Sequence, residues 1–254
     1  MRDRSFTVYG FLQRVLAPGL QNSQYAYREA LRAHCRPGIA WLDLGCGHQL
    51  MRDWMPSGQQ YEAELLRRPQ LFVGIDADVP SLRKNSTFRH LVAGDIEILP
   101  FRDEAFDLAT ANMVIEHVQC PEKFLREVRR ILRPGGEFLF HTPNLWGYTI
   151  MIARLLPQRV KVWLIRLLEG RGAGDIFATF YRLNSVRLIK ALAHKNDMQV
   201  SESSLIESSA ETAVLGPLVI FELLLIRALR TKILSKFRTN LIIVLTKPQV
   251  PTSE

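Results

Sequence analysis

The chain has 254 residues, of which 47% are hydrophobic and 23% are charged. These proportions exclude a disordered or collagen-like protein, and the length favours one large domain over two independent cores. Lys and Arg outnumber Asp and Glu by 33 to 25, so the formal net charge is +8 and an anionic partner has to be considered.

The cysteines and the N-terminal segment indicate a cytoplasmic protein. Cys35, Cys46 and Cys120 have neither the spacing of a zinc site nor that of a disulfide framework. The first apolar stretch is broken by Arg14 and Pro18, which excludes a signal-peptide core. We therefore expect a reducing compartment and no export.

The first 145 residues alternate between helix-like and strand-like patterns. The periodicity predicts helices over 23–34, 79–84 and 121–132, and strands over 39–44, 71–75, 88–93, 106–111 and 137–141. Five strands with crossover helices predict an α/β fold with a Rossmann-like, doubly wound sheet.

The pattern changes beyond residue 146. A helix over 184–194 capped by Asn184 and strands over 198–203 and 241–246 are expected. Two apolar segments, 148–168 and 217–230, carry basic residues; in the second, Glu222, Arg227 and Arg230 are predicted to share one helix face. Charges or a proline interrupt both segments, so we expect them to lie on a membrane surface or to cover a substrate pocket, not to span a bilayer.

The segment from Asp43 to Gly47 carries the first functional motif. A buried strand runs into an acid and two closely spaced glycines, which is the pattern of a turn that approaches a ligand at the carboxyl edge of a parallel sheet. A dinucleotide fingerprint requires a third glycine, but Leu50 occupies that position. The Asp43 carboxylate predicts a ligand with an ammonium group, and an NAD-dependent oxidoreductase is disfavoured.

The next two strands also end in acids. Asp76 is placed to accept hydrogen bonds from two ribose hydroxyls, although an acid here could instead cap the following helix. Asp95 could accept from an exocyclic amine, and Ile96 could lie against a purine. Together these residues predict an adenosine pocket, with Asn112 delivered to the same edge by the fourth strand.

These motifs, in this order, resemble the class I S-adenosylmethionine-dependent methyltransferases, particularly the branch that includes ubiquinone and menaquinone methyltransferases. The matching segments are 43–47, 74–76, 94–101, 106–107, 116–118 and 132–136. The resemblance implies a seven-stranded sheet with an antiparallel last strand and S-adenosylmethionine as methyl donor. It implies a donor site formed by Asp43, Leu44, Gly45, Cys46, Gly47, Asp76, Ala77, Asp95, Ile96 and Asn112.

The resemblance also implies a domain layout within a single methyltransferase domain over 1–254. Cover helices would occupy 1–37, the cofactor-binding core 38–145, hydrophobic and basic helical insertions 146–183 and 208–238, and the final strand 239–248. Gly47 and Asp76 are 29 positions apart, more than the usual ~20 between glycine turn and ribose acid. We interpret the excess as an inserted loop or a lengthened helix.

Methyl transfer from a sulfonium depends mainly on holding donor and acceptor in line. His117 and His141 are the candidate bases for an oxygen nucleophile, and each could equally be a structural hydrogen-bond donor. The position three residues before Glu116 is Met113, and Glu116 with His117 alone makes a poor divalent site, so no metal is expected.

The segments outside the core should bind the acceptor. Aromatic residues of the N-terminal segment and the two apolar, basic insertions predict a small or lipid-linked amphiphilic acceptor and contact with an anionic membrane at the inner face. The N-terminal aromatic residues concerned are Phe6, Tyr9, Phe11, Tyr25 and Tyr27. Two alternatives stay open: an RNA methyltransferase, disfavoured because no aromatic residues alternate with basic ones, and a non-catalytic membrane assembly factor. The sequence does not indicate an oligomeric state.

Overall fold

The computed structural model describes residues 2–51, 54–55, 58–156, 178–214 and 217–249. These residues belong to two compact units. The larger, which we call the sheet unit, comprises Tyr27–Thr142, Thr179–Ser204 and the chain from Ile242 onward; the smaller, the helical unit, comprises the chain up to Ala26, Pro143–Ala178 and Leu205–Leu241.

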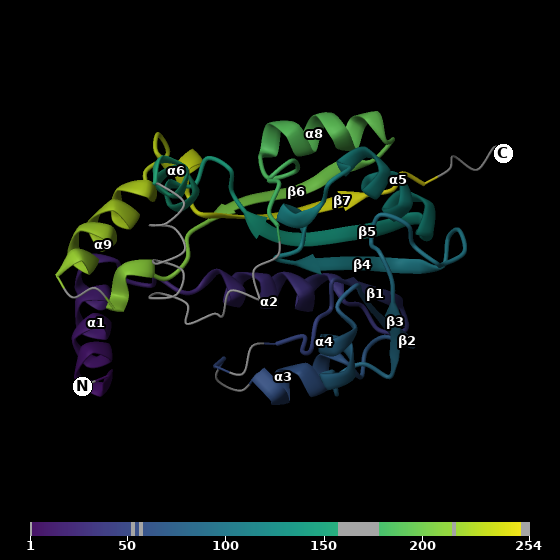
Figure 1. Cartoon of the computed structure of the whole chain (residues 1–254), viewed down its shortest axis with the longest axis horizontal. Helices are drawn as coiled ribbons and strands as arrows, with labels where there is room; N and C mark the ends of the chain where they lie inside the picture. Colours follow the sequence, from purple (N-terminus) through teal and green to yellow (C-terminus); the bar gives the residue numbers. More distant parts are fainter. Residues whose placement is uncertain (1, 52–53, 56–57, 157–177, 215–216, 250–254) are drawn as a thin grey trace. The chain divides into compact units, whose positions relative to one another are not determined.

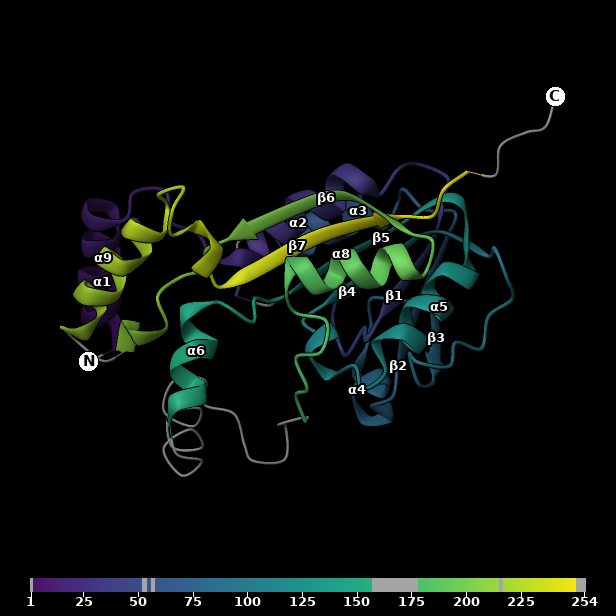
Figure 2. The same cartoon turned by 90° about the horizontal axis from the view of Figure 1, so that it is seen from above.

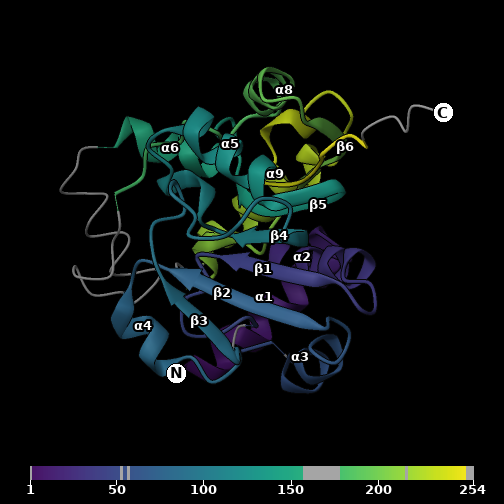
Figure 3. The same ribbon diagram turned by 90° about the vertical axis from the view of Figure 1, so that its right-hand side faces the viewer.

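A seven-stranded sheet has the order β3-β2-β1-β4-β5-β7-β6, and its first five strands follow one another in Figure 3. The neighbouring pairs from β3 to β5 are parallel, and the last strand is antiparallel. The predicted Rossmann-like sheet is therefore confirmed. The strands are β1 (Ala40–Leu44), β2 (Leu71–Asp76), β3 (His90–Ala93), β4 (Phe106–Asn112), β5 (Leu132–Pro143), β6 (Gln199–Ile206) and β7 (Asn240–Thr246).

The helices lie mostly where the apolar periodicity placed them. The α-helices are α1 (Arg2–Leu16), α2 (Ser23–His34), α3 (Gly58–Leu65), α4 (Val79–Lys84), α5 (Pro121–Ile131), α6 (Tyr148–Leu155), α8 (Val186–Lys195) and α9 (Leu218–Leu229). Short 3-10 turns are η1 (Ile115–His117), η3 (Glu211–Val214) and η4 (Ser235–Phe237). Helix α3 occupies part of the long segment between Gly47 and Asp76.

Strand β5 shows which helices cover which face of the sheet. Phe138 packs edge-on against Phe124 of α5, whereas His141 stacks on Tyr27 of α2, with ring centroids 5.6 Å apart. Because an odd number of positions separates residues on opposite faces of a strand, α5 and α2 cover opposite faces. Helix α8 lies beside α5, as Figures 1 and 2 show.

Two predicted boundaries were wrong. Strand β5 begins at Leu132, not at Glu137, because the Pro-Gly-Gly segment pairs with the chain after β7: Gly135 N donates to Lys247 O, and Lys247 N donates to Gly136 O. Ser185, not Asn184, caps α8 and accepts from the Leu188 amide. The Asn184 side chain is buried and donates instead to Thr142 Oγ1.

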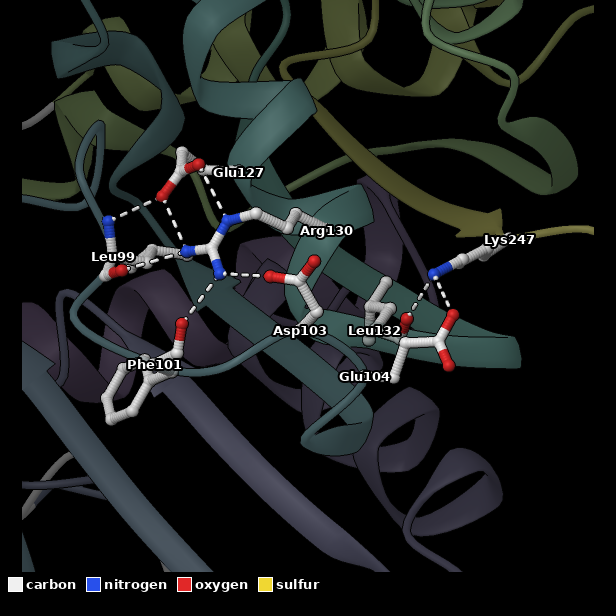
Figure 4. A network of polar contacts seen from close by, with 8 residues as sticks. All are labelled: Leu99, Phe101, Asp103, Glu104, Glu127, Arg130, Leu132 and Lys247. Carbon is white, nitrogen blue, oxygen red and sulfur yellow. Dashed lines mark hydrogen bonds and ion pairs between the residues drawn. The ribbon is translucent and has the colours of Figure 1, made fainter.

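Arg130 of α5 fixes the segment that leads from β3 to β4 (Figure 4). Its guanidinium donates to the carbonyl oxygens of Leu99 and Phe101 and to the Asp103 carboxylate at 2.7 to 2.9 Å. Two further bonds go to Glu127, which also accepts from the Leu99 amide. This bidentate pair lowers the pKa of Glu127, chiefly through the hydrogen bonds from Arg130.

The prediction that Glu222 shares one face of α9 with Arg227 and Arg230 was wrong. Glu222 does not lie beside Arg227 on an outward face; it is buried and accepts from the Glu211 and Thr212 amides and from the Tyr148 hydroxyl. The predicted helix over 148–168 is described only as α6, and its remainder lies outside the described residues. Among the helices the structure describes, none combines the length and apolar character needed to cross a bilayer.

Candidate donor-binding site

The turn after β1 is built so that only glycine fits at its first position. Gly45 has a φ of +67°, and a Cβ there would collide with the Val114 side chain. The amides of Gly45 and Cys46 both donate to the Ile75 carbonyl, which fastens the turn to the end of β2. At Gly45 no side chain stands between the backbone and a ligand that approaches the turn.

Cys46 contributes its backbone to this turn, while its side chain belongs to the core. The thiol is buried, and burial raises its pKa well above the ordinary value. A Cβ on Gly74 would collide with Cys46 and Phe88, so a glycine is required where β2 passes behind the turn. The thiol is therefore not a nucleophile.

Asp76 holds the glycine turn and the start of α4 together. One carboxylate oxygen accepts from the Gly47 amide and the other from the Asp78 amide, both at 2.8 Å. Each oxygen retains a second lone pair, which is the capacity that ribose hydroxyls would use. Asp78 occupies the N-cap position of α4 without a side-chain cap hydrogen bond, and its carboxylate accepts from Ser81 Oγ. Ala77 lies exposed between the two acids.

Asp43 is a buried carboxylate directly beneath the turn. Thr110 Oγ1 donates to Asp43 Oδ1 and accepts from the Trp41 indole nitrogen at 2.7 Å. Burial, with a smaller contribution from the charge of Asp76, raises the pKa of Asp43 to about 7. A cation beside this group would recover much of the lost solvation, which is the property required to bind an ammonium.

The loop after β3 presents an acid and apolar side chains at the same edge of the sheet. Asp95 is exposed and accepts from the Glu97 amide at 2.8 Å, while Ile96 is half-buried and Ile98 is 60% exposed. Glu97 accepts from the Gln119 and Cys120 amides, so the loop is anchored to the chain before α5. Ile98, which was not among the predicted site residues, adds a second apolar side chain to this loop.

Asn112 and His141 meet where β4 and β5 end. They are register partners, and His141 Nδ1 lies 2.9 Å from Asn112 Oδ1, so Nδ1 carries the proton and donates. His141 Nε2 is buried without a hydrogen-bond partner, and burial lowers the pKa of the imidazole to about 3. Asn112 and the backbone of Met113, which has a φ of +57°, lie at the carboxyl end of β4, the strand next to β1.

The Glu116 carboxylate is engaged in a hydrogen bond within the fold. Its carboxylate is buried and accepts from Thr142 Oγ1 at 3.0 Å, and its carbonyl accepts from the Phe180 and Tyr181 amides. It therefore ties η1 to β5 and to the segment before α8. No cluster of potential metal ligands occurs among the described residues, and His117 lies half-buried on the same 3-10 turn.

The sequence interpretation of Tyr27 was wrong. It was expected in the acceptor-binding segment, but its side chain is only 1% exposed, because it packs inside the sheet unit against His141. Burial raises the pKa of Tyr27 well above its ordinary value. Thr110 and Trp41, which complete the hydrogen-bond chain to Asp43, were not identified, because their partners are distant in sequence.

The same residues are matched by a family model described as a methyltransferase domain, over residues 42–140. This span contains the glycine turn, Asp76, the Asp95 loop and Asn112. Residues 42–140 thus match a methyltransferase domain, and their motifs are those of the class I S-adenosylmethionine-dependent methyltransferases. Within this span, a buried carboxylate, a second acid at the end of β2 and a third acid beside apolar side chains lie along the carboxyl edge of the sheet.

Two curated relatives are similar to part of this chain. A malonyl-[acyl-carrier protein] O-methyltransferase of Erwinia pyrifoliae is 35% identical over 117 residues, covering 45% of this chain and 42% of the relative. A fatty-acid O-methyltransferase of Mycolicibacterium smegmatis is 36% identical over 105 residues, covering 39% and 35%. The chain thus spans less than half the length of these relatives.

The likeness to the solved structure concerns the fold alone. A crystal structure of an S-adenosylmethionine-dependent methyltransferase from Mesorhizobium loti superposes with a TM-score of 0.56 at 17% identity. The match covers 86% of this chain and 96% of that structure. It extends well beyond residues 42–140 and therefore supports the fold outside the segment that the family model matches.

Proposed function

We propose that this chain methylates an oxygen atom of an amphiphilic acceptor, with a carboxylate as nucleophile. S-adenosylmethionine supplies a methyl group on a sulfonium, and the acceptor oxygen bonds to that carbon as the carbon–sulfur bond breaks, leaving S-adenosylhomocysteine. The observation that carries the proposal is the Gly45 turn, which follows the buried Asp43 of β1 and whose Gly47 amide donates to the Asp76 carboxylate.

Each donor-site residue has a proposed role that follows from its position. Asp43 pairs with the ammonium, and the free lone pairs of Asp76 accept from the ribose hydroxyls. Asp95 accepts from the adenine amine while Ile96 packs against the ring. The backbone of the turn provides close approach, and Asn112 borders the site from β4. The residues proposed to contact the donor are Asp43, Leu44, Gly45, Cys46, Gly47, Asp76, Ala77, Asp95, Ile96 and Asn112.

The state of His141 bears on the choice of acceptor. With a pKa near 3 and Nδ1 already donating to Asn112, this imidazole is a weak proton acceptor at neutral pH. A carboxylate is ionised at neutral pH and needs no base, whereas an alcohol does. We therefore assign His141 to positioning Asn112, and His117 is the candidate base if the acceptor is a hydroxyl.

Two further observations support an acyl carboxylate. The relatives named above are, by name, a malonyl-[acyl-carrier protein] and a fatty-acid O-methyltransferase. The helical unit carries exposed apolar residues beside basic ones, which suits an amphiphilic acceptor and a cytoplasmic protein at the inner face of a membrane. Nucleic acid is not the proposed acceptor, because the sequence shows no strand on which aromatic residues alternate with basic ones.

The experiment is a methyl-transfer assay with labelled S-adenosylmethionine and three acceptors: a long-chain fatty acid, the matching long-chain alcohol and bulk RNA. We expect S-adenosylhomocysteine to form with the fatty acid, and His117→Gln to retain most of the rate. His90→Gln, at an exposed histidine on β3, is the matched control. Methylation of RNA, or donor binding without turnover on any acceptor, would contradict the proposal and favour one of the alternatives.

A further inference from the structure

The helical unit carries most of the exposed apolar side chains. Of the seventeen large hydrophobic residues that are exposed in the described part of the chain, twelve belong to this unit, which is the smaller of the two. Exposed apolar side chains concentrated in one unit point to an interaction surface, because soluble proteins seldom leave large apolar areas in water.

The outward face of α9 is almost entirely apolar. Its exposed side chains include Phe221, which is 71% exposed, and the only charged residue among them is Arg227. The one acid of the helix, Glu222, faces inward and is satisfied there by the Tyr148 hydroxyl and two backbone amides. The other exposed apolar residues of this face are Leu218, Leu224 and Leu225.

Helix α1 repeats the same composition. Among its residues whose side chains are described, those that are exposed are Val8, Phe11, Val15 and a single charged residue, Arg14. Helices α1 and α9 lie side by side in Figures 1 and 2, and their inner faces meet in one apolar core. Each helix therefore buries one apolar face in the unit and leaves a second one in solvent.

The segment after α9 contains an exposed apolar side chain flanked by two lysines. Ile233 is 83% exposed and lies between Lys232 and Lys236, which are also exposed. An apolar side chain flanked by basic ones suits the boundary of a bilayer, where the apolar group enters the acyl region and the ammonium groups meet the headgroups.

The charge of the helical unit favours an anionic partner. Where side chains of the helical unit are described, Glu211 is the only exposed acid: Glu222 is buried, and Glu207 lies between Arg230 and Arg238 at 3.5 and 3.4 Å. Against it stand five exposed basic residues. They are Arg14, Arg154, Arg227, Lys232 and Lys236. This excess is complementary to an anionic surface.

We propose that the outward faces of α1 and α9, with the Lys232–Lys236 segment, bind an anionic lipid bilayer. We call this the α1–α9 surface. The inference rests on the proposed function, which places the chain at a membrane with an amphiphilic acceptor, and it deepens that proposal by naming the elements that make the contact. The apolar side chains enter the interface, and the basic residues at its border select anionic headgroups.

The test is flotation of the whole chain with vesicles of phosphatidylcholine alone or with 30% phosphatidylglycerol. We expect binding to the anionic vesicles only, weakening as salt rises. The double variant Phe11→Glu/Phe221→Glu should bind at least tenfold more weakly. Leu188→Glu, at an exposed apolar residue of α8 in the sheet unit, is the matched control and should bind like the unmodified chain.

The possible outcomes separate this inference from the proposed function. Equal vesicle binding by the double variant and the unmodified chain would overturn the α1–α9 surface while leaving a membrane location intact. Absence of binding to either vesicle would overturn the α1–α9 surface and the membrane location, whereas the proposed methyl transfer is tested separately by the acceptor assay. A dimer in sedimentation equilibrium that the double variant abolishes would assign the surface to a second copy of the chain instead. Titration of each variant with S-adenosylhomocysteine shows whether the donor site survives independently.

Discussion

Replacing Asp43 with Asn should stabilise the protein above neutral pH while it weakens donor binding. The side chain is buried, and its pKa is raised from 3.8 to about 7 because burial disfavours the charged form. Between pH 3.8 and about 7, Asp43 is therefore protonated in the folded state and ionised in the unfolded state. The contribution of Asp43 to stability is fully present below pH 3.8 and is lost as pH rises through about 7.

The size of the effect follows from that difference in pKa. Each pH unit is equivalent to about 1.4 kcal/mol, so ionising Asp43 costs the folded state about 4 kcal/mol by pH 7. Asn keeps the shape and an oxygen that can accept from Thr110, but it never carries the charge. The two proteins should be equally stable near pH 3.8, and the variant should be more stable by about 4 kcal/mol at pH 8.

Urea denaturation of both proteins between pH 4.5 and 8 measures this difference. The gap between the two unfolding free energies should widen by about 1.4 kcal/mol per pH unit up to pH 7. Burial lowers the pKa of His141 and makes stability fall as the pH drops below 6.5, but this acts on both proteins and cancels in the comparison. Saturating S-adenosylhomocysteine, which carries the same ammonium, should flatten the slope of the unmodified protein. Parallel pH curves without ligand would refute the reasoning.

Three further substitutions test the site and its support. Asp76→Ala should weaken S-adenosylhomocysteine binding by about 1–3 kcal/mol in calorimetry, because ribose donors lose a charged acceptor, while Asp78→Asn should bind normally. Gly45→Ala should abolish donor binding and lower the melting temperature, since its positive φ and the lack of space both oppose a side chain; a variant that binds normally would contradict this. Arg130→Met should cost about 2–3 kcal/mol in urea denaturation by releasing five hydrogen bonds, whereas Arg126→Met on the same helix should change little. If Arg126→Met lowered the free energy of unfolding as much as Arg130→Met, the stabilising role of the Arg130 hydrogen bonds would be contradicted.

Local sequence patterns were sufficient to predict an element when the residues that define it lie within the element itself. The predicted helices over 23–34 and 79–84 match α2 and α4 because their apolar spacing and flanking turns lie within a few residues. The glycine turn and Asp76 were also predictable, since parallel strands deliver their carboxyl ends to one edge. What sequence could not show is that Asp76 also holds the turn through the Gly47 amide, because that contact spans 29 positions.

Long-range partners explain the predictions that were wrong. Glu222 was expected on the same face as Arg227 because only the helical period was visible, but distant amides and the Tyr148 hydroxyl satisfy it inside the unit. Asn184 has the composition of a helix cap, yet Thr142 draws its amide into the core. In both cases a buried polar side chain takes the position where its hydrogen bonds are satisfied.

The most direct test of the central claim is calorimetric titration of the whole chain with S-adenosylhomocysteine at pH 8, alongside the Asp43→Asn/Asp76→Asn double variant. The account predicts one site per chain for the unmodified protein and at least a hundredfold loss of affinity for the double variant, with Asp78→Asn unchanged. Absence of heat at saturating ligand, or equal affinity in all three proteins, would show that these strand ends do not hold the methyl donor.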